Sequence, residues 1–358
     1  MTKTTFLRTI LISSLGLLAA CSSKLHLPLY ENGGSDRKPI VRQSLIKSQQ
    51  QVDNDHLSIQ YLGVGGHLLS YKGTQIMTAP SFSNPHFMFA GPFFPMSADK
   101  EAIDTYMPEA SKVEMVLVGH AHYDHLLDVP YVMQKHAPNA HVYGSNTTAH
   151  TLAPAIAAER IHALNDKMGD LSRPGEWVYS SSGKVRIMPI KADHAPHIMG
   201  LKFMGGSYDE DLDELPWHGF GWKEGQTLAF IIDFLNPDSS VAHRIFYQDA
   251  ASQEPLGLVP DMGDNKAIDI AILCPAAFHQ VDNYPESVVK NTQAKHFILG
   301  HWEDFFANDL SGPQRFLRLT DQDEFIERLE AAKPEDSTWV LPALFSTQHF
   351  LANGELVE

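Results

Sequence analysis

The string GHAHYDH, residues 119–125, places four metal-binding side chains within six positions: His120, His122, Asp124 and His125. It closes the apolar run MVLVGH, which has the composition of a buried strand. Residues two apart on an extended segment point to the same side, so His120 and His122 can share one ion. Asp124 and His125 lie at the turn into the next segment and can reach a second ion. Three crowded imidazoles would repel one another if protonated, and a bound cation keeps them neutral and together.

This string resembles the HxHxDH motif of the metallo-β-lactamase superfamily, and the resemblance covers roughly residues 56–346. The phrases YLGVGGHLLSYKG, HAHYDHLLDVP and GHWEDFF look most like the branch that holds N-acyl-phosphatidylethanolamine phospholipase D and the ascorbate-phosphate lactonases. The resemblance implies an α/β fold, a four-layer αβ/βα metallo-β-lactamase sandwich. Two mixed β-sheets pack face to face in it, with helices outside and a one- or two-metal site along one edge.

The same resemblance implies the remaining ligands. His194 in KADHAPH supplies a third imidazole, Asp249 in IFYQDAA falls where the family has a bridging aspartate, and His301 in ILGHWEDFF falls where it has its last ligand. His197 competes with His194, which we prefer because it directly follows a strand. Metal one would then take His120, His122 and His194, metal two would take Asp124, His125 and His301, and Asp249 would bridge them.

Two divalent ions roughly 3.5 to 4 Å apart can share a hydroxide at neutral pH, because metal binding lowers the pKa of water towards 7. That hydroxide would attack a phosphoryl or acyl centre. Asp124 would help to orient it, and Asp249 and His197 complete the candidate catalytic set. His197 would either contact the substrate or support a ligand imidazole. Imidazole and carboxylate ligands without thiolate suit zinc, with manganese or iron as alternatives.

Several neighbouring residues have two interpretations. Glu303 and Asp304 either hold ligand imidazoles by hydrogen bonds or are the first acids of a helix. His67, in a Gly-rich turn, either belongs to the pocket or is structural. The branch usually reads TDP where this chain has Thr78-Ala79-Pro80, so a supporting carboxylate is missing there.

Two apolar stretches bear on the substrate, HFMFAGPFFP (86–95) and WHGFGW (217–222). They either pack into the core or form a hydrophobic wall over the metals, whose candidate residues are Phe87, Phe89, Phe93, Phe94, Trp217 and Trp222. Such a wall suits an amphiphilic substrate presented from a membrane.

Three functions are in competition. The first is hydrolysis of a phosphodiester, including one of phospholipid type, and the second is hydrolysis of a lactone or amide, including acyl lactones and β-lactams. A phosphodiester requires cations or hydrogen-bond donors beside the metals, for which His197, Lys202 and Lys191 are candidates. The third is a non-catalytic lipoprotein scaffold, which a missing ligand or a blocked pocket would favour.

Composition limits the partners. The chain has 358 residues, of which 43% are hydrophobic, so it can bury a large core. It carries 27 Lys and Arg against 43 Asp and Glu, a net charge of −16. No basic surface is expected to neutralise phosphate backbones, so we expect a small-molecule or lipid substrate and no nucleic acid. Nothing in the composition indicates an oligomeric state.

The N-terminus reads as an export signal. Residues 1–20 hold a basic start and a twelve-residue apolar stretch, which is too short to span a bilayer as a helix. Leu18-Ala19-Ala20-Cys21 resembles the lipobox of bacterial lipoproteins, in which the cysteine is lipidated; an ordinary signal with a coincidental cysteine is the alternative. Ser22 favours the outer membrane, facing the periplasm, by resemblance to Gram-negative lipoproteins. Residues 21–54 would then form the lipidated tether, and 55–358 the hydrolase domain.

The pattern of short apolar runs predicts the elements that position the site. Three antiparallel strands come first, followed by a β-α-β unit whose helix covers 124–137, then a long insertion from about 201 to 226. A second β-α-β unit and a final helix opened by Thr320 and Asp323 complete the chain. With Cys21 acylated, Cys274 has no partner and reads as a buried small hydrophobe.

Overall fold

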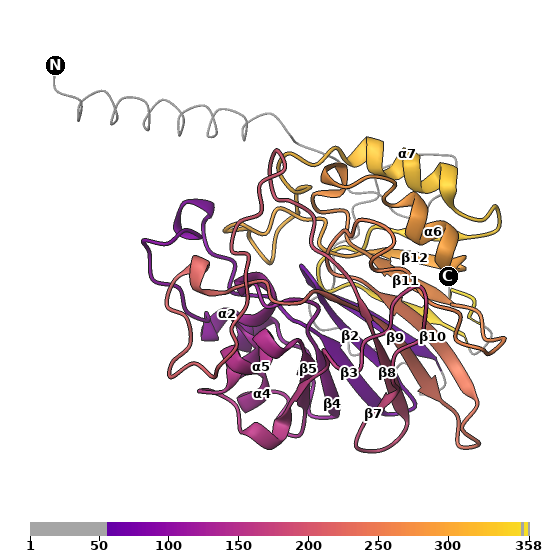
Figure 1. The fold of residues 1–358 in the computed structure, drawn as a ribbon, viewed down its shortest axis with the longest axis horizontal. Helices are drawn as coiled ribbons and strands as arrows, with labels where there is room; N and C mark the ends of the chain where they lie inside the picture. The colour runs from indigo at the N-terminus through magenta and orange to yellow at the C-terminus, as the bar shows by residue number, and fades with distance from the viewer. Residues whose placement is uncertain (1–55, 352–353, 357–358) are drawn as a thin grey trace.

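The computed structural model describes residues 56–351 and 354–356 (Figure 1). The predicted signal 1–20, the lipidated Cys21 and the tether 21–54 lie outside the described residues, so these remain predictions. Within the described part, no helix has the length and apolar content needed to span a membrane.

Seven strands form the first sheet, in the order β14-β1-β2-β3-β4-β5-β6. Their bounds are β1 Leu57–Gly63, β2 Gly66–Tyr71, β3 Thr74–Thr78, β4 Val113–Leu117, β5 His141–Gly144, β6 Ile161–Ala163 and β14 Thr347–Phe350. β1, β2 and β3 pair antiparallel, as predicted, and the pairs from β3 to β6 are parallel. The last strand, β14, returns to pair antiparallel with β1.

The second sheet also has seven strands, in the order β13-β12-β11-β10-β9-β8-β7. Their bounds are β7 Val178–Tyr179, β8 Val185–Lys191, β9 Leu228–Leu235, β10 Val241–Tyr247, β11 Ile270–Leu273, β12 His296–Leu299 and β13 Thr338–Val340. Pairs from β7 to β10 are antiparallel, and pairs from β10 to β13 are parallel. Each sheet is therefore mixed, as predicted.

Alternation along the strands builds the core between the sheets. On β9, Leu228, Phe230 and Ile232 join the cluster that fills the space between the two sheets, whereas Ala229 and Ile231 pack on the opposite face. Because successive side chains on a strand point to opposite faces, a strand covered on both faces is apolar throughout. The run LAFIIDFL thus marks a strand in the middle of a layered fold.

Helices cover the outer faces of the two sheets (Figure 1). They are α2 Lys100–Tyr106, α3 Tyr123–Leu126, α4 Val129–Lys135, α5 Asn146–Leu152, α6 Glu286–Thr292 and α7 Gln322–Ala332, with short turns η1 Phe87–Phe89, η2 Ala158–Arg160, η3 Gly219–Gly221 and η4 Phe278–Gln280. Figure 1 shows α4 and α5 beside β4 and β5, and α6 and α7 beside β11 and β12. The described chain has the four-layer αβ/βα arrangement predicted from the sequence.

Two local predictions were wrong. The helix expected over 124–137 is divided in two, because Asp128 separates α3 from α4 and Pro130 lies in the first turn of α4. The final helix is capped by Asp321, whose side chain accepts the backbone N–H of Glu324, rather than by Thr320. Cys274 is buried, as expected, and burial raises the pKa of its thiol.

Candidate metal centre

Loops that follow four strands bring the predicted ligands to one edge of the sandwich. His120 and His122 follow β4, His194 follows β8, Asp249 follows β10 and His301 follows β12. β8 and β10 both run antiparallel to β9, and β12 runs parallel to β10 through β11. The carboxyl ends of these second-sheet strands therefore meet at the same edge, and the end of β4 reaches it from the first sheet.

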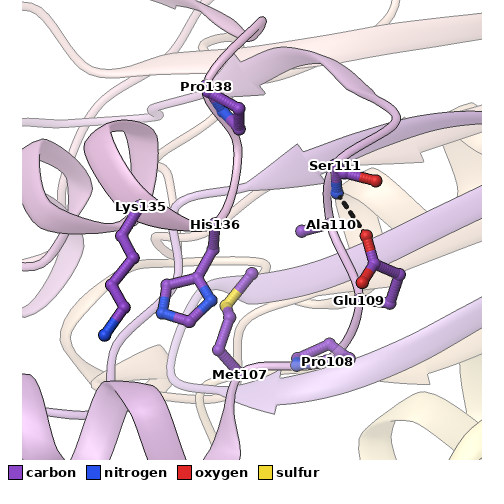
Figure 2. A pocket seen from close by; sticks show the side chains of 8 residues that line it. All are labelled: Met107, Pro108, Glu109, Ala110, Ser111, Lys135, His136 and Pro138. Carbon is purple, nitrogen blue, oxygen red and sulfur yellow. Dashed lines mark hydrogen bonds between the residues drawn. The ribbon is translucent and has the colours of Figure 1, made fainter.

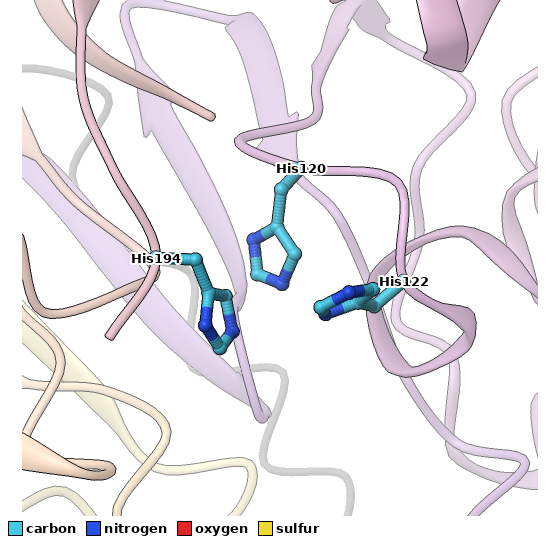
Figure 3. A group of neighbouring side chains, drawn as sticks. All are labelled: His120, His122 and His194. Atoms are coloured by element: carbon cyan, nitrogen blue, oxygen red, sulfur yellow. The ribbon is translucent and has the colours of Figure 1, made fainter. Parts of the chain in front are cut away.

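The seven predicted ligands fall into three overlapping groups, within each of which the candidate ligand atoms lie no more than 4.8 Å apart. The groups are His120, His122 and His194; His120, His125 and Asp249; and Asp124, His125 and His301. The outer two groups are the sets predicted for metal one and metal two, and the middle group joins them through Asp249. Figure 3 shows the first group with its three rings turned towards a common space.

Asp249 lies between the two outer groups. Its Oδ1 is 3.1 Å from Nδ1 of His120, and its Oδ2 is 3.3 Å from Nδ1 of His125. Asp124 joins the second group from the other side, with its Oδ2 3.6 Å from Nε2 of His125 and 3.4 Å from Nε2 of His301. Asp249 thus contacts one imidazole of each outer group, whereas Asp124 contacts two imidazoles of the second group.

Unpaired imidazole nitrogens indicate what the cluster can hold. Buried nitrogens without a hydrogen-bond partner in the described chain include Nε2 of His120 and His122, both ring nitrogens of His125, and Nδ1 of His301. Buried polar atoms are normally paired, so such a concentration needs an explanation. Nδ1 of His194 lies 2.6 Å from its own neighbour's carbonyl, that of Ala195, which leaves Nε2 as its ligand atom. This donor set fits divalent metal ions of the zinc type.

Burial and mutual repulsion keep the first group neutral. Burial lowers the pKa of His122 to about 3 and holds the pKa of His120 and His194 well below the ordinary value, and the neighbouring imidazoles lower the last two further. Neutral imidazole is the form that binds metal. Burial also raises the pKa of Asp249.

In the second group, neighbouring charges outweigh burial in setting the pKa values of Asp124 and His301. Burial would raise the pKa of Asp124, but His125 and His301 hold it well below the ordinary value, so this carboxylate is ionised. Burial would lower the pKa of His301, but the hydrogen bond and the charge of Asp124 raise it. Asp124 therefore raises the pKa of His301, whereas burial lowers the pKa of His125 and of the three imidazoles of the first group.

Two glycines leave room for these side chains. A Cβ on Gly119 would lie 2.2 Å from Oδ1 of Asp249, and a Cβ on Gly65 would lie 2.7 Å from Nδ1 of His125. Gly119 also donates its backbone N–H to Oδ2 of Asp249 at 3.1 Å. The backbone thus approaches the cluster more closely than any other residue type would allow.

Glu303 acts on the backbone around His301 and not on an imidazole. It accepts the hydroxyl of Tyr61 and, at 2.6 Å, the backbone N–H of Val64. The Tyr61 hydroxyl in turn accepts the N–H of His301 at 3.0 Å, which fixes a residue with a left-handed φ of 50°. Asp304 instead accepts a hydrogen bond of 2.6 Å from Nε of Arg318. Both predicted interpretations were wrong, because these acids touch no ligand ring and no described helix begins there.

Sequence reasoning missed Tyr247. Its hydroxyl donates to the carbonyl of Gly65 at 2.8 Å and lies 3.4 Å from Oδ2 of Asp249. The available signal was spacing, because Tyr247 ends β10 two residues before Asp249, and residues two apart share a face of a strand.

Asp128 is a buried carboxylate whose contacts the sequence analysis did not foresee. It accepts the backbone N–H groups of Phe82 at 2.6 Å and Ser83 at 2.9 Å, just after the Thr78-Ala79-Pro80 segment. Burial raises its pKa to about 6. His67 is also buried, and its backbone N–H donates to Thr78 Oγ1 at 2.8 Å; it belongs to none of the three ligand groups.

His197 lies beside the first group without being part of it. Its ring stacks on that of His194, with centroids 4.8 Å apart, and lies 5.5 Å from that of His122. The backbone N–H of Phe203 donates to its Nδ1 at 3.2 Å. Burial lowers its pKa, so the ring is neutral with its proton on Nε2. The candidate ligand group contains His194 and not His197.

The two candidate lysines differ in what they offer. Nζ of Lys202 lies 2.6 Å from Oδ1 of Asp193 and 3.8 Å from Oε1 of Glu224, so its charge is already compensated. Lys191 is exposed at the end of β8.

The predicted hydrophobic wall is exposed except for one member. Phe87, Phe89, Phe93, Phe94 and Trp217 all have exposed side chains. Trp222, the residue after the turn η3, is fully buried in the core, so its assignment to the wall was wrong.

A separate surface hollow of about 260 Å³ lies beside the end of α4 (Figure 2). Glu109 accepts the backbone N–H of Ser111 on one side of it, and Lys135 and His136 line the other. None of the seven candidate ligands borders this hollow.

Comparisons with known proteins find weak similarity. No family model matches the chain. The chain is 24% identical over 203 residues to a protein named endoribonuclease YSH1 from Eremothecium gossypii, a match that covers 46% of this chain and 25% of that protein. The chain thus spans about a quarter of the length of this curated relative.

Two solved structures are similar in arrangement. One is Igni18, a novel metallo hydrolase from the archaeon Ignicoccus hospitalis, with 15% identity and a TM-score of 0.48 over 82% of this chain and 98% of the other. The other is the metallo-beta-lactamase fold protein YhfI from Bacillus subtilis, with 12% identity and a TM-score of 0.46 over 82% of this chain and 99% of the other. Neither similarity is high enough to transfer an activity, so the chemistry rests on the side chains of this chain.

Proposed function

We propose that the protein is a metal-dependent hydrolase with a dinuclear zinc centre. The observation that carries the proposal is the set of three overlapping ligand groups, lined by buried imidazole nitrogens that have no partner in the described chain. Ligands for metal one would be His120, His122 and His194, those for metal two would be Asp124, His125 and His301, and Asp249 would bridge them.

Divalent ions bound there would lower the pKa of a water towards 7 and polarise an oxygen of the substrate. Asp249 would hold the two groups at a fixed separation, and Gly119 would hold Asp249 through its backbone N–H. Asp124 would orient the attacking water, because it is an ionised carboxylate at the edge of the second group. His197 would donate its Nε2 proton in a hydrogen bond to an oxygen of the substrate.

A phosphodiester, including one of phospholipid type, is the substrate class that we propose. His197 supports it, since it offers a hydrogen-bond donor beside the first group. The similarity to a protein named as an endoribonuclease supports phosphodiester chemistry as well. The net charge of −16 argues against a polyanionic nucleic acid, which leaves a small or lipid phosphodiester.

Hydrolysis of a lactone or amide is the second candidate. The ion pair of Lys202 with Asp193 favours it, because the compensated charge of this lysine contributes little to binding a phosphate group. An uncharged acyl substrate would need only the ions and the apolar side chains around them. A missing ligand or a blocked pocket would favour the scaffold interpretation, and no ligand is missing, because all seven candidate ligands lie in the three groups.

Turnover of bis(4-nitrophenyl) phosphate and of a lactone panel tests the proposal, with wild type beside His122→Ala and Asp249→Ala. His150→Ala is a matched control, since this histidine lies on α5 and pairs with the exposed Asp211. Phosphodiester turnover that is lost in both site variants and kept in the control supports the first candidate. Lactone turnover alone would move the proposal to the second, and no turnover after metal reconstitution would contradict the hydrolase itself.

We also propose that the protein is an exported lipoprotein attached to the outer membrane through Cys21. The lipobox-like segment before Cys21 and the serine after it support this. Mass spectrometry of the mature N-terminus is expected to find an acylated cysteine at position 21. A free N-terminus elsewhere, or an unmodified thiol, would contradict it.

A further inference from the structure

Exposed apolar side chains gather in two segments of the described chain. Among the residues that the structure describes, thirteen large hydrophobic side chains are exposed. Ten of them come from residues 87–94 and 199–220, five from each. We call these ten the apolar rim: Phe87, Met88, Phe89, Phe93, Phe94, Met199, Leu201, Phe203, Trp217 and Phe220. Contiguous exposed apolar surface on a folded chain marks an interaction site.

Residues 217–219 of the second segment lie against the first segment. The backbone N–H of Met96 donates to the carbonyl of Trp217 at 2.7 Å. Gly219 packs against the backbone of Ala90 so closely that a Cβ on it would lie 2.3 Å from the Ala90 carbonyl oxygen. Figure 1 shows the indigo loop after β3 and the salmon-coloured insertion side by side at the left of the molecule.

One row of rings connects the rim with the first ligand group. The ring of His197 stacks on that of His194, and its centroid lies 5.7 Å from the ring centroid of Phe203. The ring centroids of Phe203 and Phe220 are 6.5 Å apart. The rim therefore begins at the metal centre and continues outward to the surface.

A second row connects the rim with the second ligand group. The ring centroids of His301 and Phe305 are 5.4 Å apart, and Phe305 stacks on Phe306 at a centroid distance of 4.3 Å. The centroids of Phe306 and Phe87 are 5.2 Å apart. The rim thus borders the centre from both sides, and whatever covers the rim lies next to the site.

We infer that the apolar rim docks onto a lipid bilayer of zwitterionic phospholipid. Phe93 is 82% exposed and Met199 is 87% exposed, so these side chains stand out of the surface as an inserting side chain must. Phe, Trp and Met side chains gain free energy when they enter the boundary between headgroups and acyl chains. This inference holds whether or not the centre hydrolyses a phosphodiester, but the choice of a bilayer as the partner rests on the proposed lipidation of Cys21.

The length of chain before the described domain agrees with a bilayer as the partner. Cys21, the expected lipidation site, precedes His56 by 35 positions. At about 3.5 Å per residue, such a segment reaches at most about 120 Å. A domain attached in this way can turn its rim towards the membrane that holds it.

Charge selects the kind of bilayer. Residues 209–214, within the second segment, read DEDLDE and carry five acids in six positions. The whole chain carries −16. An anionic leaflet would repel this segment, whereas a zwitterionic one would not. The same five acids argue against a second copy of the chain as the occupant, because pairing two rims would bring two acidic runs together.

Fluorescence of Trp217 can report the docking. It is 54% exposed, whereas the indoles of Trp222, Trp302 and Trp339 are buried and Trp177 is half-buried. The full chain is reconstituted into phosphatidylcholine vesicles whose acyl chains carry bromine, a contact quencher. Subtracting the signal of Trp217→Phe isolates the emission of this residue. We expect Trp217 to be quenched in these vesicles, with and without a metal chelator, so the result does not depend on catalysis.

The double variant Phe93→Ser with Met199→Ser removes the two most exposed rim side chains. Loss of each is expected to reduce the ratio of docked to undocked protein about tenfold, so the pair reduces it about a hundredfold. Leu171→Ser with Tyr179→Ser is the matched control, since both are exposed apolar residues outside the rim, and it should leave quenching unchanged.

Three results would overturn the inference. They are an absence of quenching in the wild type, equal quenching in the rim variant, and stronger quenching in vesicles of anionic phosphatidylglycerol than in phosphatidylcholine. A dimer in vesicle-free solution that the rim variant abolishes would also overturn it, because the rim would then pair two copies of the chain.

Discussion

A single methyl group at position 119 is expected to disrupt the candidate centre. In Gly119→Ala, the new Cβ would lie 2.2 Å from Oδ1 and 2.3 Å from Oδ2 of Asp249. Non-bonded carbon and oxygen atoms approach to about 3.4 Å, so the carboxylate has to move by about 1 Å. It cannot do so freely, because it is buried between His120 and His125 and accepts the N–H of the same residue, Gly119.

The size of the effect follows from that displacement. A reacting or binding group misplaced by about 1 Å typically costs roughly 10²-fold in rate. Overpacking of a filled site costs a further 1 to 3 kcal/mol, approximately, in the free energy of unfolding. We therefore expect Gly119→Ala to fold with reduced stability, to bind both ions more weakly, and to lose about 10²-fold in turnover.

The assay combines metal content by plasma mass spectrometry, urea unfolding in chelator, and turnover at saturating zinc. Gly205→Ala is the control, because a Cβ on Gly205 meets no atom within 4 Å and its φ is not positive. The control should behave as wild type. If Gly119→Ala keeps full metal content and full turnover, then Asp249 does not occupy the position assigned to it, and the bridging role is refuted.

Three further predictions follow from the same geometry. Burial raises the pKa of Asp128 to about 6 from an ordinary 3.8, so the folded chain binds more protons between those values and its stability falls as pH rises through that window. Asp128→Asn should remove up to about 3 kcal/mol of this decrease in the free energy of unfolding. Urea unfolding in chelator at pH 4.5 and at pH 7 measures it. If the variant and the wild type differ by the same free energy at both pH values, the prediction is contradicted. His197→Gln should keep its metal content and lose roughly 10²-fold in turnover, whereas loss of metal would make His197 a ligand. Tyr61→Phe removes the group between His301 and Glu303 and should weaken binding of the second ion about 10- to 100-fold in a chelator competition, and unchanged affinity would count against the positioning role.

The sequence predicted what depends on local pattern. The HxHxDH spacing and the apolar run before it located one strand end, and strand runs before His194, Asp249 and His301 located three more. Parallel and antiparallel pairing then requires these ends to meet, so the ligand set followed from the resemblance and from the direction of the strands.

Contacts between residues distant in sequence could not be predicted. Glu303 accepts a hydrogen bond from the backbone N–H of Val64, which is 239 positions away in the turn between β1 and β2. Nothing in the sequence near Glu303 indicates this partner. Trp222 appeared in an aromatic string beside the exposed Trp217, but only the tertiary packing of the insertion decides which indole is buried. Gly119 could not be distinguished from a turn glycine until Asp249 was seen beneath it.

Anomalous diffraction at the zinc absorption edge, from crystals of the zinc-loaded protein, tests the central claim most directly. The account predicts two peaks: one among His120, His122 and His194, and one among Asp124, His125 and His301, with Asp249 between them. A single peak would contradict the dinuclear centre. No peak among these seven side chains would contradict the metal centre altogether.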